Sequence, residues 1–159
     1  MSITADTSHA DPGAGQALSI RPATLADGSS VFGVLQQLHD MGYAPDRPAF
    51  DDAFTALVSG DSSSFMLVAQ DAAGTVLGYA LTTISPLLHT SGSSAHLQEL
   101  AVDADHRGIG VGTSLMEAVE RLCRERGVRQ LLVPSRRSAD FYERLGYQST
   151  ADLLKRTFD

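Results

Sequence analysis

The stretch that decides the fold is Val102-Asp103-Ala104-Asp105-His106-Arg107-Gly108-Ile109-Gly110-Val111-Gly112-Thr113, which holds three glycines at alternate positions. A mostly apolar run, residues 97–102, leads into it, and the strongest helical pattern of the chain begins at Gly110. A strand, a glycine turn and a helix start form the geometry in which backbone N–H groups hold a phosphate. The stretch therefore predicts an anion site, and a cofactor that carries a pyrophosphate is the first hypothesis.

Two common phosphate motifs do not fit this turn. No Lys-Ser or Lys-Thr follows the glycines, so a P-loop is excluded. The spacing Gly108-x-Gly110-x-Gly112 is tighter than a dinucleotide fingerprint, and it lies past the middle of the chain rather than in a leading βαβ unit. Arg107 supplies a charged fork beside the glycines, and a helix N-terminus adds roughly half a positive charge. These features favour an anion site over a merely tight connection.

Hydrophobic periodicity predicts the other elements. We expect strands at residues 19–23, 64–70, 75–85, 95–102, 129–133 and 147–157. We expect helices at residues 29–39, from Asp46-Arg47-Pro48 to Gly60-Asp61-Ser62, at 110–126 and at 138–145. We expect a hairpin loop at residues 71–74. We also expect a loop at residues 86–94, because they contain Pro, Gly and three Ser. The order β-α-α-β-β-β-α-β-α-β indicates an α+β or mixed α/β protein with helices on the faces of one sheet.

Composition predicts one globular domain, residues 18–159, after a flexible tail, residues 1–17. The chain has 159 residues, of which 43% are hydrophobic and 19% charged. Residues 1–16 hold no Lys, Arg or apolar h-region, which argues against a signal peptide, and no apolar run approaches the roughly 18 residues of a membrane span. The single Cys123 excludes an internal disulfide and a Cys-rich zinc site, and we expect no metal. Cys123 falls on the apolar face of the predicted helix 110–126, so we expect it to pack in the core, and the missing export signal predicts a cytoplasmic location. The net charge of −7 argues against nucleic-acid binding.

Three segments give the chain a resemblance to the GNAT superfamily of N-acetyltransferases. Arg107-x-x-Gly110-x-Gly112 matches the superfamily's Arg/Gln-x-x-Gly-x-Gly/Ala signature, between the run Glu99-Leu100-Ala101-Val102 and an amphipathic helix. The segment Phe141-Tyr142-Glu143-Arg144-Leu145-Gly146-Tyr147 resembles its Phe/Leu-Tyr-x-x-x-Gly-Phe/Tyr element, and residues 20–27 resemble its usual opening. The resemblance implies a central, mostly antiparallel twisted sheet of six to seven strands flanked by about four helices.

The resemblance also implies acetyl-CoA as cosubstrate, lying in a splay between the fourth and fifth strands. Backbone groups of Leu100, Ala101 and Val102 would pair with the pantetheine arm, and a backbone N–H near Leu100 or Ala101 would polarise the thioester carbonyl. The pyrophosphate would be held by Arg107 and by the amides of Gly108, Ile109, Gly110, Val111, Gly112 and Thr113. Two positions depart from many relatives: Ser135 stands where Asn is common but can still hydrogen-bond the cofactor, and Ile109 stands where Lys or Arg is common.

The catalytic candidates implied by the resemblance are Tyr142, Glu99 and His96. Tyr142 matches the tyrosine that protonates the leaving thiolate, and a phenol with a reference pKa of about 10 is suited to that task. An alkylammonium must lose a proton before it attacks, so the site also needs a proton acceptor. Glu99, the one carboxylate inside its strand, is the first candidate for that base. His96 is the second, and its spacing of three residues from Glu99 predicts the opposite face of the strand.

The resulting hypothesis is an N-acetyltransferase that moves an acetyl group directly from acetyl-CoA to a primary amine. The acceptor stays open among small amines, aminoglycoside-like polyamines, amino acids and protein amines, and relatives are often homodimers. Tyr43, Phe50, Asp51 and Asp52 are candidates for a substrate mouth, although a solvated helix start explains the two aspartates more simply. His89, in the loop 86–94, is a candidate for the border of the acceptor site. The alternative function is a non-catalytic acyl-CoA-binding sensor or interaction module on the same fold.

Overall fold

The computed structural model describes residues 17–38, 42, 44–60, 63–135 and 138–158. The expected flexible tail, apart from its last residue, lies outside this part, as do the expected helix end at His39, the turn residues Asp61 and Ser62, and Tyr43. Two short 3-10 turns, Leu25–Asp27 and Ala104–His106, accompany the regular elements. These elements are β1 (Ser19–Pro22), α1 (Gly28–Gln36), α2 (Arg47–Ser59), β2 (Ser64–Gln70), β3 (Val76–Leu87), β4 (Gly92–Val102), α3 (Val111–Glu125), β5 (Gln130–Leu132) and α4 (Ala139–Arg144).

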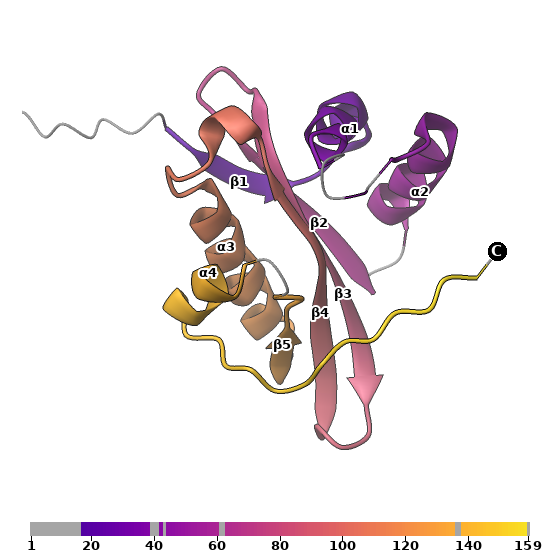
Figure 1. The fold of residues 1–159 in the computed structure, drawn as a ribbon, viewed down its shortest axis with the longest axis vertical. Helices are drawn as coiled ribbons and strands as arrows, with labels where there is room; N and C mark the ends of the chain where they lie inside the picture. The colour runs from indigo at the N-terminus through magenta and orange to yellow at the C-terminus, as the bar shows by residue number, and fades with distance from the viewer. Residues whose placement is uncertain (1–16, 39–41, 43, 61–62, 136–137, 159) are drawn as a thin grey trace, which may run out of the picture.

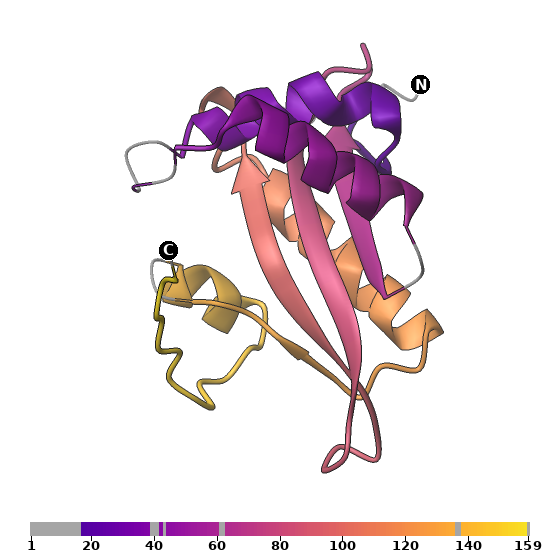
Figure 2. The ribbon, with the colours of Figure 1, turned by 90° about the vertical axis from the view of Figure 1, so that its right-hand side faces the viewer.

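The described strands form one sheet in the order β1-β2-β3-β4-β5. The first four strands pair antiparallel, and only β4 and β5 pair parallel. Helices α1 and α2 cover one face of the sheet, and α3 covers the other (Figures 1 and 2). This arrangement confirms the expected mixed α+β architecture with helices on both faces.

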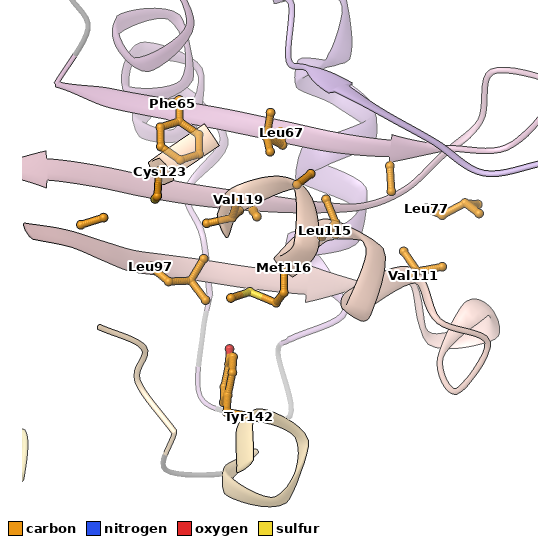
Figure 3. Close-up of a cluster of buried hydrophobic side chains, with 14 residues drawn as sticks. Phe65, Leu67, Leu77, Leu97, Val111, Leu115, Met116, Val119, Cys123 and Tyr142 are labelled. Atoms are coloured by element: carbon orange, nitrogen blue, oxygen red, sulfur yellow. The ribbon is translucent and has the colours of Figure 1, made fainter. Parts of the chain in front are cut away.

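Helix α3 shows why the strongest sequence pattern folds as predicted. Leu115, Met116, Val119 and Cys123 repeat at helical spacing and are buried against the sheet, with Phe65 and Leu97 opposite them (Figure 3). Cys123 is therefore a packed core residue, as expected. A second, separate core lies between the sheet and helices α1 and α2.

An ion pair of Asp27 links the start of α1 to strand β1 at the edge of the sheet. Its carboxylate accepts hydrogen bonds from two nitrogens of the Arg21 guanidinium, at 2.7 and 2.8 Å, and from the backbone N–H of Thr24. The hydrogen-bonded Arg21 guanidinium is the main cause that lowers the pKa of Asp27 to about 2. This ion pair joins β1 to the turn that begins α1.

Two of the secondary-structure predictions are wrong. Residues 86–94 are mostly strand rather than loop, since Pro86 pairs with Ser93 and Leu87 with Gly92, so only residues 88–91 turn. Cross-strand pairing overrides the local preference of Pro, Gly and Ser at this position. The last expected strand, residues 147–157, has no regular structure, and residues 148–158 are exposed. The described sheet therefore has five strands instead of six or seven.

Candidate active site

The glycine turn requires two backbone conformations that suit glycine. Gly108 has φ of +76° and Gly110 has φ of +94°, both in the left-handed region. Gly110 is the N-cap of α3, and no side chain caps the helix there. The first amides of α3 consequently point out of the helix without a side-chain acceptor, which is the arrangement that holds an anion.

The third glycine differs from the other two, because its φ is not in the left-handed region. A Cβ added at Gly112 would lie 3.4 Å from the Phe141 ring and 3.8 Å from the Val102 side chain, which are ordinary packing distances. The structural need for glycine in this turn therefore falls on Gly108 and Gly110.

The side chains beside the turn are exposed. Arg107 donates from Nε to the Val102 carbonyl oxygen at 3.1 Å, which keeps this cation next to the end of β4. Ile109 is 62% exposed, at the position where many relatives were expected to carry a cation. Arg107 is consequently the described cation nearest in sequence to the glycines.

Sequence reasoning missed a hydrogen-bond network that supports the turn. The Gln37 side chain, at the end of α1, donates to the Asp103 carboxylate at 2.6 Å and accepts from the backbone N–H of Ala104 at 2.7 Å. Asp103 also contacts the His106 ring nitrogen Nδ1 at 2.6 Å. These partners, Gln37 first, lower the pKa of Asp103. Residues 103–106 belong to the predicted turn, but no feature of their sequence indicates a contact with Gln37.

Strand β4 has an edge that β5 does not cover. The β4–β5 pairing spans only Ser94↔Gln130, Ala95↔Leu131 and His96↔Leu132, whereas β4 runs on to Val102. Beyond His96 the two segments diverge, as Figure 2 shows. The main chain of residues 100–102 lies along this uncovered edge, at the place predicted for the pantetheine arm.

Tyr142 projects from α4 toward the diverging strands. Its hydroxyl is directed at the sheet near Leu97 and Met116 (Figure 3). The ring stands edge-on to those of Phe141 and Tyr147, with centroids 5.0 and 5.7 Å away. Burial raises the pKa of Tyr142 to about 12, so the phenol stays protonated at neutral pH.

A bulge in β4 corrects one sequence prediction. Leu81 pairs with Glu99 but Thr82 pairs with Leu97, so Gln98 is an extra residue on β4. The extra residue shifts the alternation of side chains, and His96 and Glu99 consequently lie on the same face of the sheet. The expectation that His96 points to the opposite face is wrong because it assumed an unbroken strand.

The bulge opens a cavity of about 430 Å³ between the sheet and helices α1 and α2. Gln98 and Glu99 reach into it side by side, and the Gln98 amide donates to the Thr83 hydroxyl at 2.8 Å. The other lining residues are apolar except for one tyrosine: Val31, Leu35, Phe50, Ala53, Phe54, Leu57, Met66, Tyr79 and Leu81.

Two polar groups of this cavity lie in unusual surroundings. The Tyr79 side chain is 1% exposed, and its hydroxyl lies beside the Glu99 carboxylate. Burial first, and then the charge of Glu99 and a hydrogen bond with it, raise the pKa of Tyr79. Partial burial raises the pKa of Glu99 above its ordinary value, although the residue is exposed at its solvent side. A carboxyl group with a raised pKa is better matched to proton transfer near neutral pH.

The remaining candidates lie away from this cavity. Ser135 is exposed after β5, and its backbone carbonyl accepts from the Ser138 N–H. Asp51 pairs with Arg47 on the exposed side of α2, which agrees with the simpler interpretation of a solvated helix start. His89 is exposed at the tip of the β3–β4 hairpin.

Two general searches cover only the described residues. Within them, no group of three or more His, Cys, Asp or Glu side chains is arranged to hold a metal ion. None of the described helices has the length and apolar character to cross a membrane.

Comparison with known proteins agrees with the fold. Residues 33–147 match the model of the acetyltransferase (GNAT) family. Glucosamine 6-phosphate N-acetyltransferase 1 of Oryza sativa subsp. japonica is 31% identical over 143 residues, which is 85% of this chain and 84% of that protein. Among solved structures, a transcriptional regulator from Bacillus halodurans C-125 has a TM-score of 0.81 at 23% identity, covering 89% of this chain and 100% of that one.

A second solved structure points the same way. The glucosamine-6-phosphate N-acetyltransferase from Arabidopsis thaliana has a TM-score of 0.76 at 20% identity, and the match covers 91% of this chain and 100% of that one. At these identities the structural likeness shows the fold, whereas the family model and the rice relative show the family to which the chain belongs. The chain is therefore an acyltransferase that belongs to the acetyltransferase (GNAT) family.

Proposed function

We propose that this protein transfers the acetyl group of acetyl-CoA directly to a primary amine. One observation carries the proposal: strand β4 connects three features that such a reaction needs. The glycine turn and the uncapped start of α3 follow its end, its edge at residues 100–102 is uncovered by β5, and Glu99 projects from it into a cavity.

The residues around the glycine turn fit a coenzyme A diphosphate. The amides of residues 108–113 would donate hydrogen bonds to its oxygens, because the helix start has no side-chain cap and the helix dipole favours an anion. Arg107 would add a positive charge, and Ser135 a hydrogen bond. The main chain of residues 100–102 would pair with the pantetheine arm, as in strand addition. When bound, the coenzyme supplies an activated thioester.

Proton transfer would use groups on both sides of the sheet. Glu99 would accept a proton from the incoming ammonium, directly or through water, and His96 remains a second candidate on the same face. The amine nitrogen then bonds to the acetyl carbon as the carbon–sulfur bond breaks. Tyr142 would donate a proton to the departing thiolate. In sum, an ammonium and an acetyl thioester give an amide, a thiol and one proton.

Calorimetry and a thiol-release assay test the proposal. We expect coenzyme A to bind and acetyl-CoA to be consumed with at least one primary amine. Coenzyme A binding without turnover of any amine would instead favour the sensor function. The absence of coenzyme A binding would contradict both the acetyltransferase and the sensor function.

Replacement of Glu99 tests the base. Glu99→Gln should lower kcat/KM by about 100-fold or more, which is the lower end of the range for a positioned general base. Wild-type kcat/KM should fall as the pH drops through the raised pKa of Glu99, because protonation removes the base. The matched control is Glu117→Gln on the exposed side of α3, which should behave like the wild type. If the pH dependence of kcat/KM in Glu99→Gln were the same as in the wild type, Glu99 would not be the general base and His96 would become the candidate.

A further inference from the structure

The cavity beside Glu99 indicates which kind of amine this enzyme accepts. Its walls are built from apolar side chains of α1, α2, β2 and β3, and its polar groups are Gln98, Glu99 and the Tyr79 hydroxyl. No Lys, Arg or His belongs to the described lining. The cavity therefore offers one negative charge, two neutral polar groups and a large apolar surface.

Helix α2 supplies the aromatic part of the wall. The rings of Phe50 and Phe54 are stacked with centroids 5.5 Å apart, and the edge of Phe32 contacts Phe50 at 5.0 Å. Phe50 and Phe54 line the cavity, and Leu57 continues the same side of the helix. Such a surface gains free energy when it covers an alkyl or aryl group, and it has no hydrogen-bonding groups for the hydroxyls of a sugar.

The cavity wall places a buried phenol next to Glu99. Tyr79 pairs with Ala101 and Leu81 with Glu99, so Tyr79 and Glu99 are diagonal neighbours on adjacent strands. The Tyr79 hydroxyl is close enough to the Glu99 carboxylate for a hydrogen bond between them to affect the pKa of both groups. The carboxylate is therefore the group of this pair that an amino group in the cavity would contact.

We infer that the acceptor is a primary amine with an uncharged, apolar body, such as an alkylamine or arylalkylamine. This inference rests on the proposed acetyl transfer. The ammonium would lie against the Glu99 carboxylate, and its apolar body would pack under Phe50, Phe54 and Leu57. A sugar phosphate fits poorly, because its anion would enter a cavity that already holds Glu99 and whose described lining has no cation. We therefore do not expect glucosamine 6-phosphate, which the name of the rice relative gives as its acceptor, to be the acceptor of this chain.

A panel of amines tests the inference. Thiol release from acetyl-CoA would be followed with hexylamine, 2-phenylethylamine, spermidine and glucosamine 6-phosphate. We expect kcat/KM for the first two to exceed that for glucosamine 6-phosphate by about 100-fold or more, as expected where a site must bury an unpaired charge. A preference for glucosamine 6-phosphate or spermidine would overturn the inference and leave acetyl transfer intact. No turnover of any amine would remove acetyl transfer itself.

A matched pair of variants on α2 tests the location. Ala53 lines the cavity, and Ala56, one turn along the helix, is exposed and lies outside the lining. Ala53→Lys should raise KM for hexylamine by about 10-fold, since it places a like charge near the ammonium, and should leave KM for acetyl-CoA unchanged. Ala56→Lys should change neither constant. Equal effects of the two variants, or none from Ala53→Lys, would show that the amine binds elsewhere.

Discussion

Both faces of the sheet carry an apolar core, but their cavities differ in what lines them. On the α3 face, Leu97, Leu115 and Met116 are completely buried, and a cavity of about 350 Å³ lies beside that core between α3, β5 and residues 145–147. On the α1–α2 face, a cavity of about 430 Å³ reaches the sheet itself, where the bulge at Gln98 turns two consecutive polar residues toward α1 and α2. The comparison teaches that one irregular residue in a strand can bring a carboxyl group to an otherwise apolar face.

The largest expected effect concerns the start of α3, where both faces meet the end of β4. Gly110→Glu should abolish detectable binding of coenzyme A in calorimetry, because the side chain would extend into the open space at the anion site. The control is Gly127→Glu at the other end of α3, which also has a positive φ and open space. Both variants should lose about 1 kcal/mol of stability from backbone strain. Equal coenzyme A affinity in the two variants would contradict the assignment of the turn.

The second prediction compares the two faces directly through stability. Leu115→Ala should lower the free energy of unfolding by about 3 kcal/mol, because it leaves a void in a closed core. Leu57→Ala should cost only about 1 kcal/mol, since Leu57 already borders a cavity and is only partly buried. Denaturant unfolding of both variants measures the difference. Equal losses would mean that the α1–α2 face is as tightly packed as the α3 face.

The third prediction concerns the proton donor on the α3 side. Tyr142→Phe should lower kcat by about 10- to 100-fold and leave KM for acetyl-CoA unchanged, because it removes the acid and keeps the ring. Tyr147→Phe is the matched control, since the Tyr147 hydroxyl bonds Glu120 at 2.9 Å and has no proposed part in the reaction. Steady-state kinetics of both variants would decide the role. Unchanged turnover in Tyr142→Phe would rule out the acid function.

The smallest expected effect lies at the attachment of α1. The pKa of Asp27 is about 2 in the folded protein and 3.8 ordinarily, so its stabilisation is present above pH 4 and is lost as the pH falls toward 2. Asp27→Asn should therefore reduce the free energy of unfolding at neutral pH by about 1–2 kcal/mol after allowance for solvent screening. The control, Asp51→Asn in the exposed pair with Arg47, should lose about 0.5 kcal/mol or less. Chemical denaturation at pH 7 and pH 3 checks both values, and an Asp27 variant that tracks the control would contradict the role of the ion pair.

The part of the site that follows the chain locally was predictable. Gly108, Gly110 and the apolar spacing of α3 lie within one continuous segment, so the sequence pattern indicated the turn, the helix and the anion site together. The β5–α4 region was also recognisable from Tyr142 and Gly146.

The features that required the structure depend on contacts between distant segments. The bulge at Gln98 exists only in the pairing of β3 with β4, so the shared face of His96 and Glu99 could not be read from spacing. Gln37 supports the glycine turn from a position 66 residues away from Asp103. The long β3–β4 hairpin formed through pairing despite Pro86 and Gly92.

By itself, the sequence determined the order of most elements, the family resemblance and the glycine turn before α3, because local conformation and hydrophobic spacing act between near neighbours. The tertiary structure alone decided which side chains share a face and where the cavities lie. Those properties arise from strand register and from packing between layers, and both are set by the whole chain at once.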